Sequence, residues 1–179
     1  MNPFAPSFRT GILLAPALAA FIAQTTLAGK LPTAEEMTEA LAREEGSETR
    51  GGSGDDGRGV AVEAKPAIAV SLHFAYDSTE LVSAEEKQWI AKTAATVFKS
   101  PRFARHTFVV EGHTDARGTH TYNLDLSKRR AESIRTLLIA AGVPPEQLRA
   151  IGKGKLELLT QGATEADHQK NRRVVFLRE

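Results

Sequence analysis

From residue 66 onward, the spacing of apolar residues switches repeatedly between the two periods that distinguish strands from helices. The segments with strand-like patterns are residues 67–76, 106–112, 148–154 and 172–178. The segments with helical spacing are residues 83–100 and 119–141. The order strand, helix, strand, helix, strand, strand predicts an α/β (α+β) two-layer sandwich with a mixed sheet. Because crossovers are right-handed, both helices should cover one face of that sheet.

Both helices have start and stop signals in the sequence. Ser83 followed by Glu86 is a capping-box pattern before the first helix, and Pro101 follows its end. The second helix is closed by Gly142, with Pro144 beyond it. The two helices are therefore predicted as separate elements of one domain, residues 66–179.

The chain ahead of this domain divides into two parts. Residues 1–28 contain one basic residue, no acidic residue, an apolar run at 11–22 and a small-residue end, which is typical of a signal peptide cleaved after Ala28. A retained membrane anchor is the alternative, but a transmembrane helix needs about 20 apolar residues and this run is shorter. Residues 29–65 contain a short acidic helix at 33–45 and a glycine-rich flexible linker.

The short acidic helix has only two large apolar side chains, Met37 and Leu41. So few apolar residues cannot hold a helix of this length without a partner. Two roles stay open for residues 29–65. They dock on an envelope protein, or they form an acidic spacer.

Composition excludes several classes of function. The chain has 23 basic and 22 acidic residues, a formal net charge of +1, and therefore no basic surface of the kind that binds nucleic acid. It contains no cysteine, which excludes a disulfide, a thiol nucleophile and a lipid-modified cysteine within this sequence. After signal cleavage, no transmembrane span is expected.

An arginine lies in the middle of the apolar stripe of the second helix. On a helical wheel with about 100° per residue and Leu126 at zero, Leu137 falls near 20°, Ile134 near 80° and Arg130 near 40°. Burying an unpaired guanidinium costs several kcal/mol. Arg130 is therefore expected to contact a carboxylate, a group of carbonyls or an anionic ligand.

Asp115 is the candidate carboxylate within the chain. It lies in the loop that leads into this helix, where Gly112 and Gly118 are expected to permit a sharp turn. In one interpretation Asp115 and Arg130 pair directly and fix the loop to the helix. In the other they lie apart and together recognise a zwitterion, with the carboxylate binding an ammonium and the guanidinium binding a carboxylate.

Long segments around these residues resemble the peptidoglycan-binding domain at the C-terminus of OmpA-type outer-membrane proteins, which also occurs in the peptidoglycan-associated lipoprotein and in flagellar stator proteins. The matching segments are "FAYDSTEL" at 74–81, "VEGHTDARGTHTYNLDLSKRRAESI" at 110–134, "GVPPEQLRAIGKGK" at 142–155 and "NRRVVFLRE" at 171–179. The resemblance implies non-catalytic binding of peptidoglycan, a periplasmic location at the cell wall or outer membrane of a Gram-negative bacterium, and no cofactor, metal or catalytic residue.

The resemblance also assigns residues. In the family, the positions of Asp115 and Arg130 hold the meso-diaminopimelate of the peptide stem. Other positions that line or shape the site are Tyr76, Asp77, Thr114, Gly118 and Asn123. Asn123 also falls near 60° on the wheel, so it either makes an inward polar contact or bonds local backbone. Residues 171–173 are interpreted mainly as the start of the last strand, with one arginine in an internal ion pair.

A rival hypothesis is enzymatic. His113, Asp115 and His120 carry ligand types that suit zinc or iron. No fourth ligand or base of defined spacing accompanies them, so a metal-dependent hydrolase is the less favoured alternative to a binding protein or an envelope interaction module.

Overall fold

The computed structural model describes residues 30–43, 65–75 and 77–179. The predicted signal peptide, the glycine-rich linker and Tyr76 lie outside these residues. Across the described part of the chain, none of the helices combines the length and the hydropathy needed to cross a membrane.

Four strands form one mixed sheet. They are β1 (Ala67–Val70), β2 (Phe108–His113), β3 (Leu148–Gly154) and β4 (Val174–Arg178), in the order β1-β4-β2-β3. β2 and β3 are parallel, and β4 runs antiparallel between β1 and β2. The last strand of the chain therefore lies in the middle of the sheet, which places its first residues beside the end of β2.

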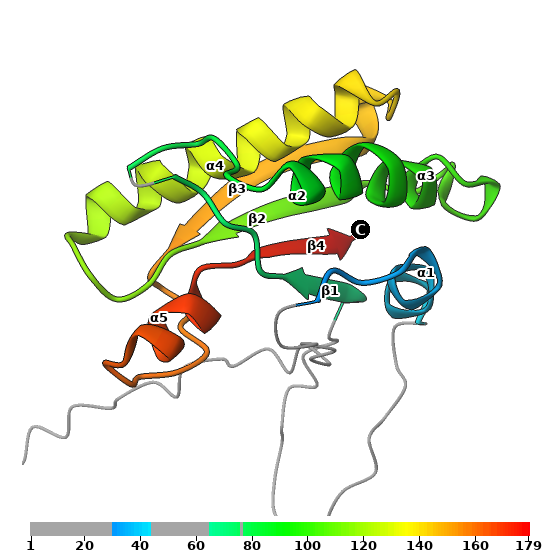
Figure 1. The fold of residues 1–179 in the computed structure, drawn as a ribbon. Helices are drawn as coiled ribbons and strands as arrows, with labels where there is room; N and C mark the ends of the chain where they lie inside the picture. Colours follow the sequence, from blue (N-terminus) through cyan, green and yellow to red (C-terminus); the bar gives the residue numbers. More distant parts are fainter. Residues whose placement is uncertain (1–29, 44–64, 76) are drawn as a thin grey trace, which may run out of the picture.

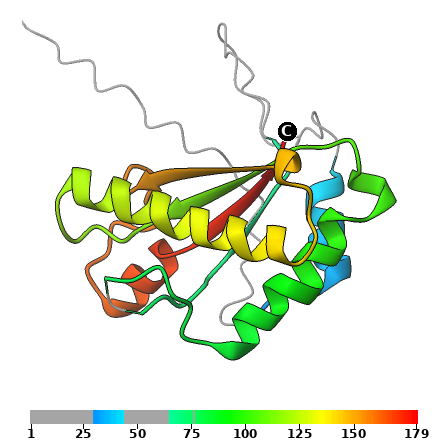
Figure 2. The ribbon, with the colours of Figure 1, turned by 90° about the horizontal axis from the view of Figure 1, so that it is seen from above.

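The helices that the sequence predicts lie over one face of this sheet (Figures 1 and 2). The first is α2 (Ala84–Trp89), a π-helical turn (Ile90–Ala94) and α3 (Ala95–Phe98) in succession, and the second is α4 (His120–Ala140). This arrangement confirms the two-layer α/β sandwich. Between the layers, the Phe98 ring lies 4.4 Å from that of Phe108 and 5.5 Å from that of Phe176, measured between centroids.

The short acidic helix packs on the domain itself. It is α1 (Ala34–Ala42), and its predicted capping box between Thr33 and Glu36 is formed. Met37 and Leu41 are both fully buried in the core, and Pro32 accepts a hydrogen bond from the Trp89 indole at 2.6 Å. The partner that the two apolar residues require is thus this same domain, and a spacer role for this helix is wrong.

The predicted secondary structure needs correction in several places. The first strand ends at Val70 rather than at residue 76, because the chain then leaves the sheet and His73 donates its backbone N–H to the carboxylate of Glu86 at 3.0 Å. Glu86 therefore does not complete the predicted capping box, although Ser83 still caps the helix. A further helix, α5 (Glu165–Asn171), lies just before β4 and was not predicted.

Gly112 has a different role from the predicted one. It lies within β2, opposite Gly152 of β3, and α4 crosses directly over both residues. A Cβ atom at Gly112 would overlap the backbone carbonyl oxygen of Ser127 and lie 2.9 Å from its carbonyl carbon. Gly112 thus permits close packing of helix on sheet, whereas Gly118, with φ of 84°, does provide the predicted turn.

Candidate ligand-binding site

The loop between β2 and α4 is held in place from three sides. Thr114 donates its backbone N–H to Gly154 at 2.9 Å. Asn123 donates from Nδ2 to the carbonyl of Arg117 at 2.6 Å, and Lys155 donates from Nζ to the carbonyl of Gly118 at 2.7 Å. Asn123 is buried and also bonds local backbone, so it combines both of its interpretations. This loop presents Asp115 in a fixed position.

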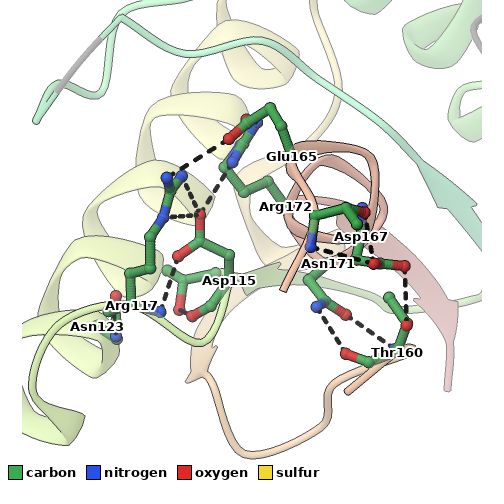
Figure 3. A network of polar contacts seen from close by, with 10 residues as sticks. Asp115, Arg117, Asn123, Thr160, Glu165, Asp167, Asn171 and Arg172 are labelled. Carbon is green, nitrogen blue, oxygen red and sulfur yellow. Dashed lines mark hydrogen bonds and ion pairs between the residues drawn. The ribbon is translucent and has the colours of Figure 1, made fainter. Parts of the chain in front are cut away.

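Two arginines hold the Asp115 carboxylate (Figure 3). Arg117 contacts Oδ2 through Nη2 at 2.8 Å and through Nε at 3.2 Å, and its backbone N–H donates to Oδ1 at 3.1 Å. Arg172 contacts Oδ2 through Nη1 at 2.9 Å. Glu165 contacts both guanidinium groups, at 2.7 Å from Arg172 and 3.4 Å from Arg117. Asp115 is thus the centre of a charged network built from the loop, α5 and the start of β4.

The pKa of Asp115 reflects opposing effects. Burial raises the pKa of its carboxyl group, but the hydrogen bonds from Arg117 and Arg172 together outweigh burial and hold the pKa below the ordinary value of 3.8. Asp115 is therefore a carboxylate at neutral pH and can attract a ligand cation.

Arg130 is buried, as the wheel predicts, with 8% of its surface exposed. Its Nε donates to the backbone carbonyl of Ser78 at 3.0 Å, and its guanidinium lies over the ring of Phe74 at 4.7 Å from the centroid. No described residue accepts a hydrogen bond from its two terminal nitrogens. Burial lowers the pKa of Arg130, yet an arginine stays charged at neutral pH. This guanidinium thus retains two donors for an anion.

Asp115 and Arg130 do not pair with each other. Among the described residues, the partners of Asp115 are Arg117 and Arg172, and Arg130 contacts Ser78 and Phe74 instead. The interpretation as a direct structural pair is therefore wrong. The two groups still influence each other, because the charge of Asp115 raises the pKa of Arg130.

Two more of the predicted residues lie near Asp115 and Arg130. Asp77 has φ of 47° and accepts a hydrogen bond from the Tyr122 hydroxyl at 2.6 Å, which connects its turn to the start of α4. Thr114 is buried beside Asp115. Arg117 and Glu165 were not predicted as part of the network, while the "NRR" segment that contains Arg172 carried the expectation of an internal ion pair, now confirmed.

The three residues of the metal hypothesis are not brought together as a metal group. Asp115 is engaged by the two arginines and His120 is exposed. His113 is buried, with a carboxylate oxygen of Glu111 at 3.7 Å from Nε2. The enzymatic reading of these three side chains therefore has no support in the geometry.

We expect His113 to make stability depend on pH. Burial holds its pKa below the ordinary 6.5, although nearby Glu111 opposes this shift. As pH falls below about 6.5, the unfolded chain takes up this proton before the folded chain does, so stability is full above that pH and is lost on the way down to the folded pKa. The melting temperature, measured in EDTA, should be lower at pH 5.5 than at pH 7.5. His113→Asn should reduce this difference. An unchanged difference in the folded variant would assign the effect to other groups.

Comparison with known proteins agrees with the predicted family. A family model described as the OmpA family matches residues 73–172. The peptidoglycan-associated lipoprotein of Legionella pneumophila is 39% identical over 106 residues, which are 59% of this chain and 58% of that protein. The peptidoglycan-associated lipoprotein of Pseudomonas aeruginosa is 34% identical over 63% of this chain and 64% of its own length. The chain thus matches less than two thirds of the length of these relatives.

Solved structures of related proteins also resemble this chain. The peptidoglycan-associated lipoprotein from Burkholderia pseudomallei aligns with a TM-score of 0.54 and 30% identity, over 60% of this chain and 88% of that one. The periplasmic domain of Helicobacter pylori MotB aligns with a TM-score of 0.52 over 63% of this chain and 73% of that one, and at 23% identity it supports the fold alone. The relatives at 30% identity or more are named as peptidoglycan-associated lipoproteins, which agrees with the prediction of a non-catalytic protein.

Proposed function

The chain belongs to the OmpA family, and from this premise we propose that it binds peptidoglycan without catalysis, through the meso-diaminopimelate of the peptide stem. Relatives named as peptidoglycan-associated lipoproteins support the polymer. The observation that carries the finer proposal is a buried guanidinium, that of Arg130, whose terminal nitrogens have no acceptor among the described residues, near a carboxylate, that of Asp115.

These two groups suit the two charges of an amino-acid head group. Arg130 donates two parallel hydrogen bonds to the ligand carboxylate, which is the geometry that a guanidinium favours. Asp115 receives the ligand ammonium. The guanidinium that gives way to the ammonium is that of Arg117, because its side chain is 59% exposed while that of Arg172 is 30% exposed. The carboxylate therefore exchanges one cation for another and stays charged.

Binding of one stem should be weak. A hydrogen bond to a charged group contributes about 1.5 to 3 kcal/mol, so a few such bonds correspond to micromolar or millimolar affinity. Peptidoglycan presents the same peptide many times, so sites are concentrated at the wall and a protein that dissociates can rebind nearby. The same proposal places the protein in the periplasm, with the cell wall as its main partner. An envelope protein remains a further proposed partner for residues 29–65, through surfaces other than the buried apolar side of α1.

Co-sedimentation with purified peptidoglycan tests this function. Wild-type protein should pellet with diaminopimelate-type peptidoglycan, and Asp115→Asn and Arg130→Met should each reduce the pelleted fraction by at least about tenfold, because each loses one charged contact. Asp125→Asn and Arg129→Met are matched controls. These two residues lie on α4, as Arg130 does, and form an exposed ion pair at 2.8 Å. Circular dichroism establishes that every variant is folded.

Lysine-type peptidoglycan tests whether the protein recognises diaminopimelate itself or the polymer in general. Its third residue lacks the side-chain carboxylate of diaminopimelate, so wild-type protein should prefer the diaminopimelate type and Arg130→Met should lose that preference. Equal binding of the two polymers by wild type would refute recognition of this carboxylate. Failure to pellet with either polymer would refute peptidoglycan binding itself.

A further inference from the structure

A second group of charged and metal-ligating side chains lies on the other face of the sheet. Phe108 and Val110 point into the core beneath the helices, so the alternation along β2 directs Glu111 and His113 to the opposite face. Glu157, which follows β3, joins them there. One imidazole nitrogen and two carboxylate oxygens of these three residues all lie within 4.8 Å of one another.

His113 is the unusual member of this group. Its side chain is 0% exposed, and neither of its ring nitrogens has a hydrogen-bond partner among the described residues. Its Nε2 lies 3.7 Å from an oxygen of Glu111, which is too far for a hydrogen bond. A buried imidazole normally satisfies at least one nitrogen.

The two carboxylates already face a common cation. Lys153 Nζ lies 2.8 Å from Glu157 and 3.7 Å from Glu111. Lys153 is the extra residue where the pairing of β2 and β3 shifts register, and such a bulge redirects a side chain. Its side chain is 29% exposed, so the ammonium can move into solvent. Arg173 stays nearby, because it is buried and donates to the carbonyl of Glu157 at 3.1 Å.

We propose that Glu111, His113 and Glu157 form a three-ligand site for a divalent transition metal, Zn²⁺ in particular. One imidazole and two carboxylates are ligands that Zn²⁺ accepts, and water completes a tetrahedral set. Binding expels the Lys153 ammonium from between the carboxylates, so the ion replaces one positive charge by two. The fixed charge of Arg173 repels the ion and weakens its affinity. This site shares no residue with Asp115 and Arg130 and does not depend on the proposed function.

Calorimetric titration of the tag-free, EDTA-treated and dialysed protein with ZnCl₂ tests the site. Wild type should bind one equivalent. His113→Asn and Glu157→Gln should each weaken binding by at least about tenfold, as loss of a ligand requires. Glu157→Gln keeps the test informative if the buried His113 variant fails to fold, because the Glu157 side chain is 42% exposed. Visible absorption of the Co²⁺ form should show a tetrahedral site that disappears in Glu157→Gln.

The Lys153→Gln variant distinguishes a metal site from an internal ion-pair network most clearly. If its ammonium competes with the metal ion, this variant should bind Zn²⁺ several-fold more tightly than wild type. If the cluster is only an internal ion-pair network, the variant should bind no better. His120→Asn is the control for adventitious surface binding, since His120 is exposed and outside the cluster. No binding by wild type, undiminished binding by Glu157→Gln, or an equal loss in His120→Asn would each overturn the proposal.

Discussion

Alanine at Gly112 is expected to leave little folded protein at 37 °C. The added Cβ atom would overlap the carbonyl oxygen of Ser127, and this obstacle is backbone rather than the movable end of a side chain. Relief requires α4 to move away from β2 and β3, which opens the core along the helix. Losses above about 4 kcal/mol have few causes, and this one combines overpacking with displacement of a helix. Because a domain has only about 5 to 15 kcal/mol of stability, chemical denaturation should show most of it gone.

Gly118→Ala is the matched control for this prediction. Its Cβ atom would meet the nearest side chain, that of Tyr122, at 3.5 Å, an ordinary contact, so only the positive φ of 84° opposes the substitution. That strain costs about 1 to 2 kcal/mol. The two alanine variants should therefore differ clearly. If Gly112→Ala is as stable as Gly118→Ala, α4 does not pack against the sheet as closely as the contact between Gly112 and Ser127 requires.

The sequence was sufficient to predict the layers of this fold because its periodicity and capping signals agree. The helix at 119–141 is observed at His120–Ala140, and the strand at 148–154 is observed with the same bounds. The order of strands was not predictable in the same way. Nothing local in residues 172–178 indicates that β4 inserts between β1 and β2, since that position depends on pairing between distant segments.

The two errors of secondary structure also have physical reasons. Helix α5 has only seven residues and no large apolar side chain, so helical periodicity could not reveal it. The pattern of Thr164 and Asp167 was the available signal, because these residues form a capping box at its start. Residues 71–75 alternate like a strand, yet the backbone N–H of His73 bonds to the carboxylate of Glu86 and that of Ala75 to the carbonyl of Glu80, outside the sheet.

The candidate site was predictable only in part. The wheel identified Arg130 because a charge within an apolar stripe is visible from local sequence alone. The partners of Asp115 were not visible, since Arg172 is 57 residues away along the chain and reaches the loop only because β4 lies next to β2. The same strand order brings α5 and Glu165 to the site. The residues that hold the charged network are thus determined by topology rather than by spacing.

Asn171→Ala is expected to destabilise the protein and to loosen this network together. The Asn171 side chain is fully buried. It accepts hydrogen bonds from the backbone N–H groups of Leu159 and Thr160, at 2.8 and 3.2 Å, and donates to the carbonyl of Thr160 at 2.9 Å (Figure 3). Alanine would leave three backbone groups without their partner, at a cost of about 2 to 4 kcal/mol. The melting temperature should fall by roughly 5 to 15 °C.

The loosening follows from the position of Asn171 directly before Arg172. Without the bonds of Asn171, the segment at 155–164 no longer fixes the backbone next to Arg172. The guanidinium of Arg172 is then no longer held against Asp115. Limited proteolysis should therefore cut the variant within this segment at a temperature where wild type resists. Thr160→Val is the control, because it removes the hydroxyl that donates to Asp167 at 3.0 Å and accepts from the backbone N–H of Gly162 at 3.2 Å, and it keeps every Asn171 bond. It should cost about 1 to 2 kcal/mol. Equal melting temperatures for Asn171→Ala and wild type would mean that Arg172 is positioned by β4 alone, and that the segment at 155–164 packs independently of the site.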